Sequence, residues 1–130
     1  MKQRIALITL VVPDYDAGIG FYRDRLGFDL VEDTSLPDGK RWVVVRPRGG
    51  EGTGLLLAEA ADEGQSAAIG RQTGGRVGFF LHTEDFDRDR AAFLLAGVRF
   101  LEEPRKEAYG TVAVFEDIFG NRWDLLEPAG

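Results

Sequence analysis

The chain offers few side chains that could perform catalysis or bind a metal ion. It contains one histidine, His82, and no cysteine. Thiolate nucleophiles, iron–sulfur clusters and zinc fingers are therefore excluded, and one chain cannot supply a three-histidine zinc site. His82 could act as a general base, because an imidazole titrates near neutral pH. The alternative is a histidine at a strand end that is hydrogen-bonded to the adjoining loop.

Two short motifs could suggest other chemistry. The glycine-rich segment 50–54 superficially resembles a dinucleotide-binding loop, but a strand pattern follows it where a helix is required. The acidic segment 84–87 stands directly before a helical pattern, where carboxylates cap the helix and stabilise its N-terminus. Turn and capping roles therefore explain both motifs better than catalysis does.

The charge and hydropathy of the chain exclude several classes of partner. It has 16 Lys and Arg against 22 Asp and Glu, a formal net charge of −6, so no general attraction to nucleic acid or anionic lipid is expected. The longest apolar run, residues 5–12, is too short to span a bilayer, and Pro13 follows it where a signal peptide would have its cleavage site. We therefore expect a soluble cytoplasmic protein that binds neither nucleic acid nor membrane.

Hydrophobic periodicity and turn residues predict the same order of elements twice along the 130 residues. In the first half we expect a helix over 17–26, capped by Asp14 or Asp16 and ended by Gly27, and strands over 5–12, 28–33, 41–46 and 54–59. In the second half we expect a helix over 88–95, capped by Asp85 or Asp87 and ended by Gly97, and strands over 76–82, 98–102, 111–116 and 121–126.

The two halves correspond residue by residue. Asp16 and Gly27 match Asp87 and Gly97, which lie 71 and 70 positions later. The sequence therefore predicts an α+β protein of two tandem βαβββ modules, whose strands form a curved mixed sheet around a concave cleft. Module one spans about 4–60 and module two about 76–128. The linker between them, about 61–75, could form a short helix over 67–72.

Side chains alternate across a sheet, so each predicted strand can be divided into two faces. One face is uniformly apolar and is expected to lie under the helices: Ala6, Ile8, Leu10, Val12, Val77, Phe79, Leu81, Trp123 and Leu125. The opposite face mixes small, apolar and charged groups: Leu7, Thr9, Arg76, Gly78, Phe80, His82, Arg122, Asp124 and Leu126. Such a mixture suits a binding cleft. The alternative is a solvated face of an antiparallel sheet.

Two segments carry a resemblance to a known family. The opening of the chain resembles that of the vicinal oxygen chelate superfamily, which includes glyoxalase I, bleomycin-resistance proteins and extradiol dioxygenases, in residues 11–16, Phe21-Tyr22 and Leu26-Gly27-Phe28. Residues 115–125, with Asp117 and Gly120, are similar to the closing turn and last strand of that family. The resemblance implies the paired-module fold and a homodimer, in which the modules pair within one chain or between chains.

In metal-dependent members of this family, one metal ligand projects from the first and one from the last strand of each module. The corresponding positions here are Leu7, Leu56, Gly78 and Asp124, and only Asp124 has a ligand-type side chain. A catalytic divalent metal needs about three protein donors. We therefore expect no bound metal and no cofactor, and a metal-independent small-molecule binding protein. The alternative is a divalent-metal-dependent lyase, isomerase or dioxygenase.

The expected binding surface follows from these faces and from nearby aromatic residues. Arg76 or Arg122 could bind an anionic group of the ligand, or Asp124 could form an internal ion pair with one of them. The full set of candidate binding residues is Leu7, Thr9, Trp42, Leu56, Arg76, Phe80, His82, Tyr109, Phe115, Arg122 and Asp124.

Overall fold

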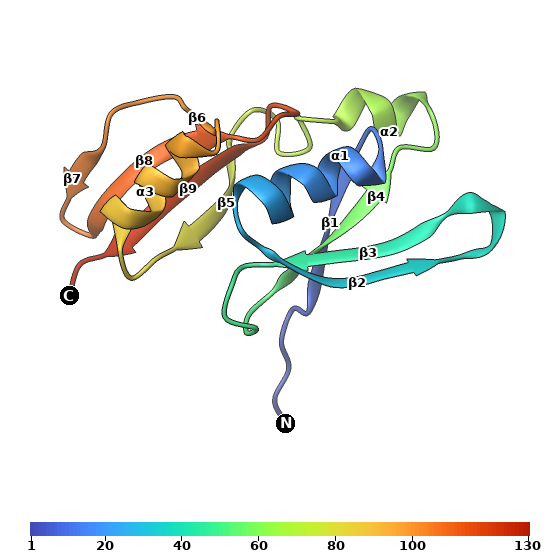
Figure 1. Ribbon diagram of the computed structural model, residues 1–130, viewed down its shortest axis with the longest axis horizontal. Coiled ribbons are helices and arrows are strands. Elements are labelled where there is room, and N and C mark those ends of the chain that lie inside the picture. The colour runs from blue at the N-terminus through green and yellow to red at the C-terminus, as the bar shows by residue number, and fades with distance from the viewer. The chain divides into compact units, whose positions relative to one another are not determined.

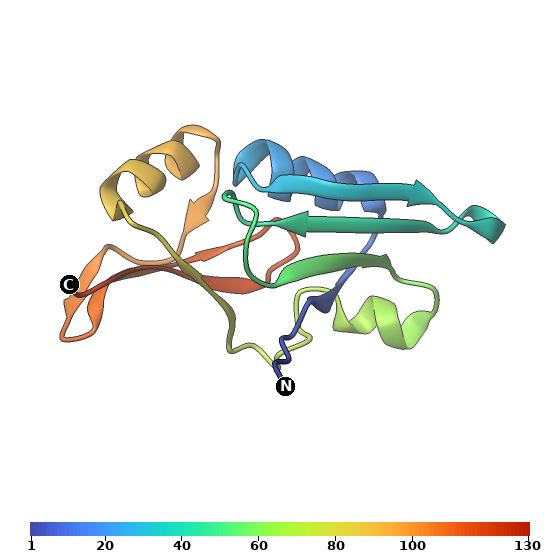
Figure 2. The ribbon, with the colours of Figure 1, turned by 90° about the horizontal axis from the view of Figure 1, so that it is seen from below.

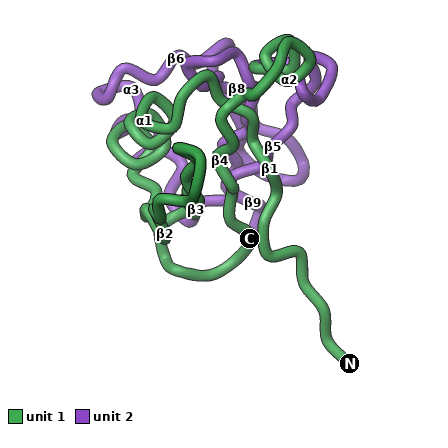
Figure 3. Tube along the Cα trace, turned by 90° about the vertical axis from the view of Figure 1, so that its right-hand side faces the viewer, with its two compact units in different colours: residues 1–69 green, residues 70–130 purple.

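The computed structural model describes all residues from 1 to 130, and Figure 1 and Figure 2 show the chain in two views. It divides into two compact units, Met1–Ile69 and Gly70–Gly130 (Figure 3). Each unit contains one hydrogen-bonded sheet. None of the helices is long and apolar enough to cross a membrane.

Unit 1 is a mixed four-stranded sheet with a helix packed on it (Figure 1). The strands lie in the order β1-β4-β3-β2, and the pairing of β1 with β4 is parallel while the other two are antiparallel. Its elements are β1 (Leu7–Val12), α1 (Tyr15–Ile19), the π-helical η1 (Gly20–Arg25), β2 (Asp29–Ser35), the 3-10 turn η2 (Pro37–Gly39), β3 (Arg41–Arg46), β4 (Gly54–Glu59) and α2 (Glu63–Ala68).

The first helix begins where its cap places it. The Asp14 side chain accepts a hydrogen bond of 2.7 Å from the backbone N–H of Ala17, so α1 begins at Tyr15, two residues before the predicted start. Gly27, with a φ of 75°, ends the helical segment as predicted, because its N–H donates to the carbonyl oxygen of Arg23.

The core of unit 1 lies between α1 and the sheet. Leu10, Val12 and Leu57 are fully buried there. A Cβ on Gly18 would stand 2.9 Å from Cδ1 of Leu57, so the glycine allows α1 to lie close to β4. Ile8 was expected in the same core, but its side chain is 45% exposed. The alternation of side chains along β1 predicts which face of the sheet each residue occupies. It does not predict how much of the strand the helix covers, which depends on packing.

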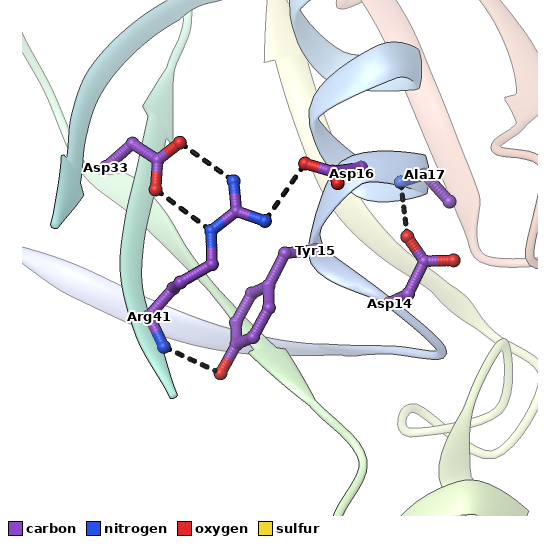
Figure 4. Close-up of polar contacts among 6 residues, drawn as sticks. All are labelled: Asp14, Tyr15, Asp16, Ala17, Asp33 and Arg41. Carbon is purple, nitrogen blue, oxygen red and sulfur yellow. Dashed lines mark hydrogen bonds and ion pairs between the residues drawn. The ribbon is translucent and has the colours of Figure 1, made fainter. Parts of the chain in front are cut away.

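A charged cluster ties α1 to the strands β2 and β3 (Figure 4). The Arg41 guanidinium binds Asp16 at 2.9 Å and Asp33 at 2.8 Å, and these carboxylates raise the pKa of Arg41 above its usual value. The guanidinium carbon lies 5.2 Å from the centre of the Tyr15 ring, and the Tyr15 hydroxyl accepts a hydrogen bond from the Arg41 backbone N–H. One arginine therefore joins three elements of unit 1.

Unit 2 repeats the plan of unit 1 (Figure 2). Its strands lie in the order β5-β9-β8-β6, β7 pairs with the edge of β8, and β5 is parallel to β9. Its elements are β5 (Val77–His82), α3 (Phe86–Leu95), β6 (Arg99–Phe100), β7 (Arg105–Glu107), β8 (Gly110–Glu116) and β9 (Arg122–Pro128). The predicted α+β fold of two βαβββ modules is confirmed.

Several element boundaries differ from the prediction for local reasons. The Asp85 carboxylate accepts a hydrogen bond from the N–H of Arg88, so α3 begins at Phe86, two residues earlier than expected. The predicted strand 98–102 is shortened to β6, and β7 was not predicted. In the segment expected as a linker, Asp62 caps α2 through the N–H of Gln65, so this helix covers Glu63–Ala68 in place of 67–72.

The core of unit 2 is largely aromatic. The rings of Phe79 and Trp123 stack with centres 4.6 Å apart, and Phe115 stacks on the other side of Trp123 at 5.8 Å. Phe93 of α3 meets the ring of Phe115 at 5.4 Å, edge to face. Phe115 is therefore a fully buried core residue under α3, and its side chain does not line the face where it was expected.

A buried polar turn connects β8 to β9. One oxygen of Asp117 accepts hydrogen bonds of 2.9 Å from the backbone N–H groups of Phe119 and Asn121, and the other accepts one of 2.8 Å from the Asn121 amide. Both Asp117 and Asn121 are buried. These hydrogen bonds hold the chain in a turn between the end of β8 at Glu116 and the start of β9 at Arg122.

We predict that two neighbouring glycines differ in their tolerance of a side chain. Gly70 and Gly74 have φ values of 74° and 69°, so alanine is strained at either position, by about 1–2 kcal/mol. A Cβ on Gly70 would also overlap the carbonyl oxygen of Phe119, whereas a Cβ on Gly74 would meet open space. Gly70→Ala should therefore lose about 1–3 kcal/mol more than Gly74→Ala.

Urea denaturation followed by circular dichroism measures both losses. Equal losses for the two variants would show that the Gly70 backbone does not lie against the Asp117 turn.

Candidate functional site

The candidate residues of unit 1 share the face of the sheet turned away from α1. We call the face of each sheet turned away from α1 or α3 its distal face. In unit 1, Thr9 pairs with Leu56 across β1 and β4, and Leu56 pairs with Val44 across β4 and β3. Leu7 and Trp42 follow the same alternation and are 36% and 38% exposed. This distal face is therefore mainly apolar and carries an accessible indole.

The candidate residues of unit 2 form rows across its distal face. In the central row Phe80 pairs with Asp124, and Asp124 pairs with Val114. The neighbouring row runs across strands β5, β9, β8 and β7 and consists of His82, Leu126, Val112 and Arg105. Phe80 is 63% exposed and lies beside the Asp124 carboxylate. An accessible ring and a carboxylate thus meet on adjacent strands about 4.8 Å apart.

A bulge in β5 removes Gly78 from these rows. Val77 pairs with Arg122 and Phe79 pairs with Trp123, so Gly78 has no cross-strand partner. A Cβ at Gly78 would stand 2.6 Å from Cγ2 of Thr73, which leaves no room for a larger side chain. The position that the resemblance matches to a metal ligand therefore lies against the preceding loop.

Asp124 is the candidate residue whose pKa departs from its ordinary value. Its Oδ1 atom is closed off from solvent and has no hydrogen-bond partner. Burial raises the pKa of Asp124, the positive charge of Arg105 lowers it, and the negative charge of Glu102 raises it further. The carboxyl group therefore holds its proton more readily than an exposed aspartate does.

Arg105 is the functional-site candidate that sequence reasoning missed. Its Nε donates to Glu102 at 3.0 Å, and its Nη1 lies 3.4 Å from a carboxylate oxygen of Glu107. The hydrogen bond with Glu102, and after it the interaction with the half-exposed Tyr109, raise the pKa of Arg105. Its strand, β7, has three residues, too few for periodicity to detect. The one feature of the sequence that could have indicated this ion pair is the spacing of three residues between Glu102 and Arg105.

The two arginines expected to bind an anion are placed differently. Arg76 precedes β5 and is exposed. Arg122 lies on the distal face in a third row, beside Glu116, which forms an ion pair with Arg99. The expected ion pair between Asp124 and Arg76 or Arg122 is absent, and the charges that act on Asp124 are those of Arg105 and Glu102.

The residues do not fit a catalytic divalent metal. Leu7 and Leu56 lack donor atoms, and Gly78 lacks a side chain. No group of three or more His, Asp or Glu in the chain is arranged to hold a metal ion. Asp124 alone provides too few donors, so we derive no chemical step through a metal.

We predict that Asp124→Asn makes the protein less sensitive to rising pH. The folded pKa of Asp124 is raised, so the folded state binds more protons than the unfolded state above the ordinary carboxyl pKa. The native chain should therefore lose stability as the pH rises through the raised pKa, and the asparagine variant should not. Unfolding free energies measured from pH 3 to 7 check this, and parallel pH curves for the two proteins would contradict it.

Comparison with known proteins agrees with this architecture. Residues 4–125 match the model of the Glyoxalase/Bleomycin resistance protein/Dioxygenase superfamily. An uncharacterized protein of Shewanella frigidimarina is 54% identical over 98% of this chain and 95% of its own. The crystal structure of TnmS3, an antibiotic binding protein from Streptomyces sp. CB03234, is 30% identical with a TM-score of 0.78 over 98% of both chains. UcmS2 is 29% identical with a TM-score of 0.83, over 98% of this chain and 99% of its own. The chain belongs to the glyoxalase/bleomycin resistance protein/dioxygenase superfamily.

Proposed function

We propose that the protein binds a flat organic molecule without a metal ion. The observation that carries this proposal is that Leu7, Leu56 and Gly78 occupy three of the four positions that the resemblance matches to metal ligands, in sheets whose distal faces also present Trp42 in unit 1 and Phe80 in unit 2. Each of these faces, taken by itself, offers apolar contact and aromatic stacking, which are the main sources of affinity in small-molecule sites.

The comparison with TnmS3 supports the ligand class. That protein is described as antibiotic binding, and it shares 30% of its residues with this chain over nearly the whole length. Many antibiotics combine fused rings with a few polar groups, which is the chemistry that an exposed aromatic side chain with neighbouring polar side chains would recognise. We therefore propose polycyclic aromatic antibiotics as the first ligands to test.

The set of residues that we propose for contact with the ligand is narrower than the set expected from the sequence. Phe115 is left out because it is buried in the core. The residues that remain in it each lie on or beside the distal face of their own unit: Leu7, Thr9, Trp42, Leu56, Arg76, Phe80, His82, Tyr109, Arg122 and Asp124.

We predict that ligand binding is reported by Trp42. The chain has two tryptophans, Trp42 and Trp123, and only Trp42 is exposed. Titration with polycyclic aromatic antibiotics in EDTA should quench the fluorescence of the native protein, with a dissociation constant in the micromolar range. In Trp42→Phe the remaining signal comes from the buried Trp123, so most of the quenching should disappear.

Two results would contradict this function. The first is binding that appears only after Zn²⁺, Ni²⁺ or Fe²⁺ is added, which would favour a metal-dependent lyase, isomerase or dioxygenase. The second is one equivalent of a transition metal per chain after native purification, lost in Asp124→Ala. Elemental analysis measures the second directly.

We also propose that the protein is a homodimer. Strands β1 and β5 are edge strands of their sheets, and Ile5 and Ile8 at the β1 edge region are exposed. Natural proteins protect exposed edge strands from uncontrolled pairing, and a second copy of the chain in a symmetric dimer is a common way to bury such a strand. Light scattering at micromolar concentration should give twice the 14.4 kDa of one chain, and a mass of 14.4 kDa would count against the dimer.

A further inference from the structure

We propose that Asp124 accepts a hydrogen bond from a cationic nitrogen of the ligand, an ammonium or amidinium group, while an aromatic part of the same ligand lies on Phe80. This inference rests on the proposed function, because it names the chemical class of ligand for the distal face of unit 2. It assigns Asp124, which stands at a metal-ligand position of the family, to direct contact with an organic cation.

The first argument is the unsatisfied acceptor. Oδ1 of Asp124 is closed off from solvent and has no partner, although buried carboxylate oxygens in folded proteins are nearly always hydrogen-bonded. Cross-strand neighbours do not supply one, because Phe80 and Val114 stand on either side and have no donor in their side chains. A donor brought by a ligand would satisfy this atom.

The second argument is that Arg105 is already occupied. Its guanidinium binds the carboxylates of Glu102 and Glu107 and forms a hydrogen bond with Tyr109. The other oxygen of Glu102 accepts a hydrogen bond of 2.9 Å from the backbone N–H of Val114, which holds this ion pair beside the central row. Arg105 therefore acts on Asp124 through its charge and not through a hydrogen bond.

The third argument is the sign of the local charge. Three carboxylates, from Glu102, Glu107 and Asp124, surround the single guanidinium of Arg105. The other charged groups on or beside this distal face are Arg122, Arg76 and the Arg99–Glu116 pair. An anion placed at Asp124 would meet an excess of negative charge, whereas a cation would neutralise part of it.

Phe80 determines the shape of the ligand. It is the cross-strand neighbour of Asp124 and is 63% exposed, so a ring can stack on it from the solvent side. Strands lie about 4.8 Å apart, a separation that a short chain between an aromatic ring and a nitrogen can bridge. The 2-phenylethylammonium ion is the smallest probe with both groups at this spacing.

The test compares three probes of equal size that differ in charge: 2-phenylethylammonium, 2-phenylethanol and phenylacetate. Titrations are followed by the backbone amide NMR signals of residues 80, 114 and 124. The ammonium should bind in the millimolar range expected of so small a molecule, the alcohol several-fold more weakly, and phenylacetate should cause no saturable shift.

Matched variants separate the carboxylate from the general charge of the protein. Asp124→Asn should weaken ammonium binding at least tenfold, and Phe80→Ala should weaken all binding. Asp87→Asn removes the same charge from the first turn of α3, the helix on the other side of the sheet, and should leave binding unchanged. The amide spectrum of each variant verifies that it is folded.

Proton release gives an independent readout. A cation beside Asp124 lowers the pKa of its carboxyl group, so binding at a pH where this carboxyl group is partly protonated should release protons from the native chain and not from Asp124→Asn. Calorimetry in two buffers of different ionisation heat measures the number released.

The proposal is overturned if phenylacetate binds as well as the ammonium, if Asp124→Asn binds the ammonium like the native chain, or if the ammonium causes no saturable shift. These failures are separate from failure of the proposed function. If aromatic antibiotics quench Trp42 equally in the native chain and in Asp124→Asn, metal-independent binding stands and the role of Asp124 falls.

Discussion

The pairing of the first strand with the last strand of each unit is the constraint on which the rest of the structure depends. β1 lies parallel to β4, and β5 lies parallel to β9, although the paired residues, such as Leu7 with Gly54 and Val77 with Arg122, are more than forty positions apart in the sequence. Closing such long loops costs conformational entropy, which burial of facing residues must offset. The buried pair Leu10 and Leu57 supplies part of this in unit 1. The same pairing sets Asp124 beside Phe80 on the other side of the second sheet.

Much of this arrangement could be predicted because it depends on local patterns. The bounds of β3 and β4 were predicted to the residue, since each is a short apolar strand between clear turns. The alternation of side chains could not show which face of the sheet Phe115 occupies, because β8 is apolar on both faces. Val112 and Ala113, for example, are neighbours in sequence and both are fully buried. The role of Arg105 could not be predicted either, since its strand β7 has only three residues and shows no periodicity.

The two sheets present different chemistry at the positions that the resemblance matches to metal ligands. In unit 1 these positions carry leucines, so the surface around Trp42 is suited to stacking and to contact with apolar groups. In unit 2 one position is closed by Thr73 and the other keeps a carboxylate with a raised pKa. A repeated fold therefore provides one apolar surface and one polar surface from the same strand positions.

The position of β9 has a consequence for synthesis on the ribosome. The sheet of unit 1 has all four strands once residue 59 has emerged, so it can close while the rest of the chain is still being made. The sheet of unit 2 lacks its central strand until residues 122–128 appear, and by then β5 and α3 are already outside the tunnel. Phe79 and Phe93 then have no Trp123 and no finished sheet to pack on. The nascent second half is thus the stretch that chaperones and nascent-chain quality control would meet with exposed aromatic surface.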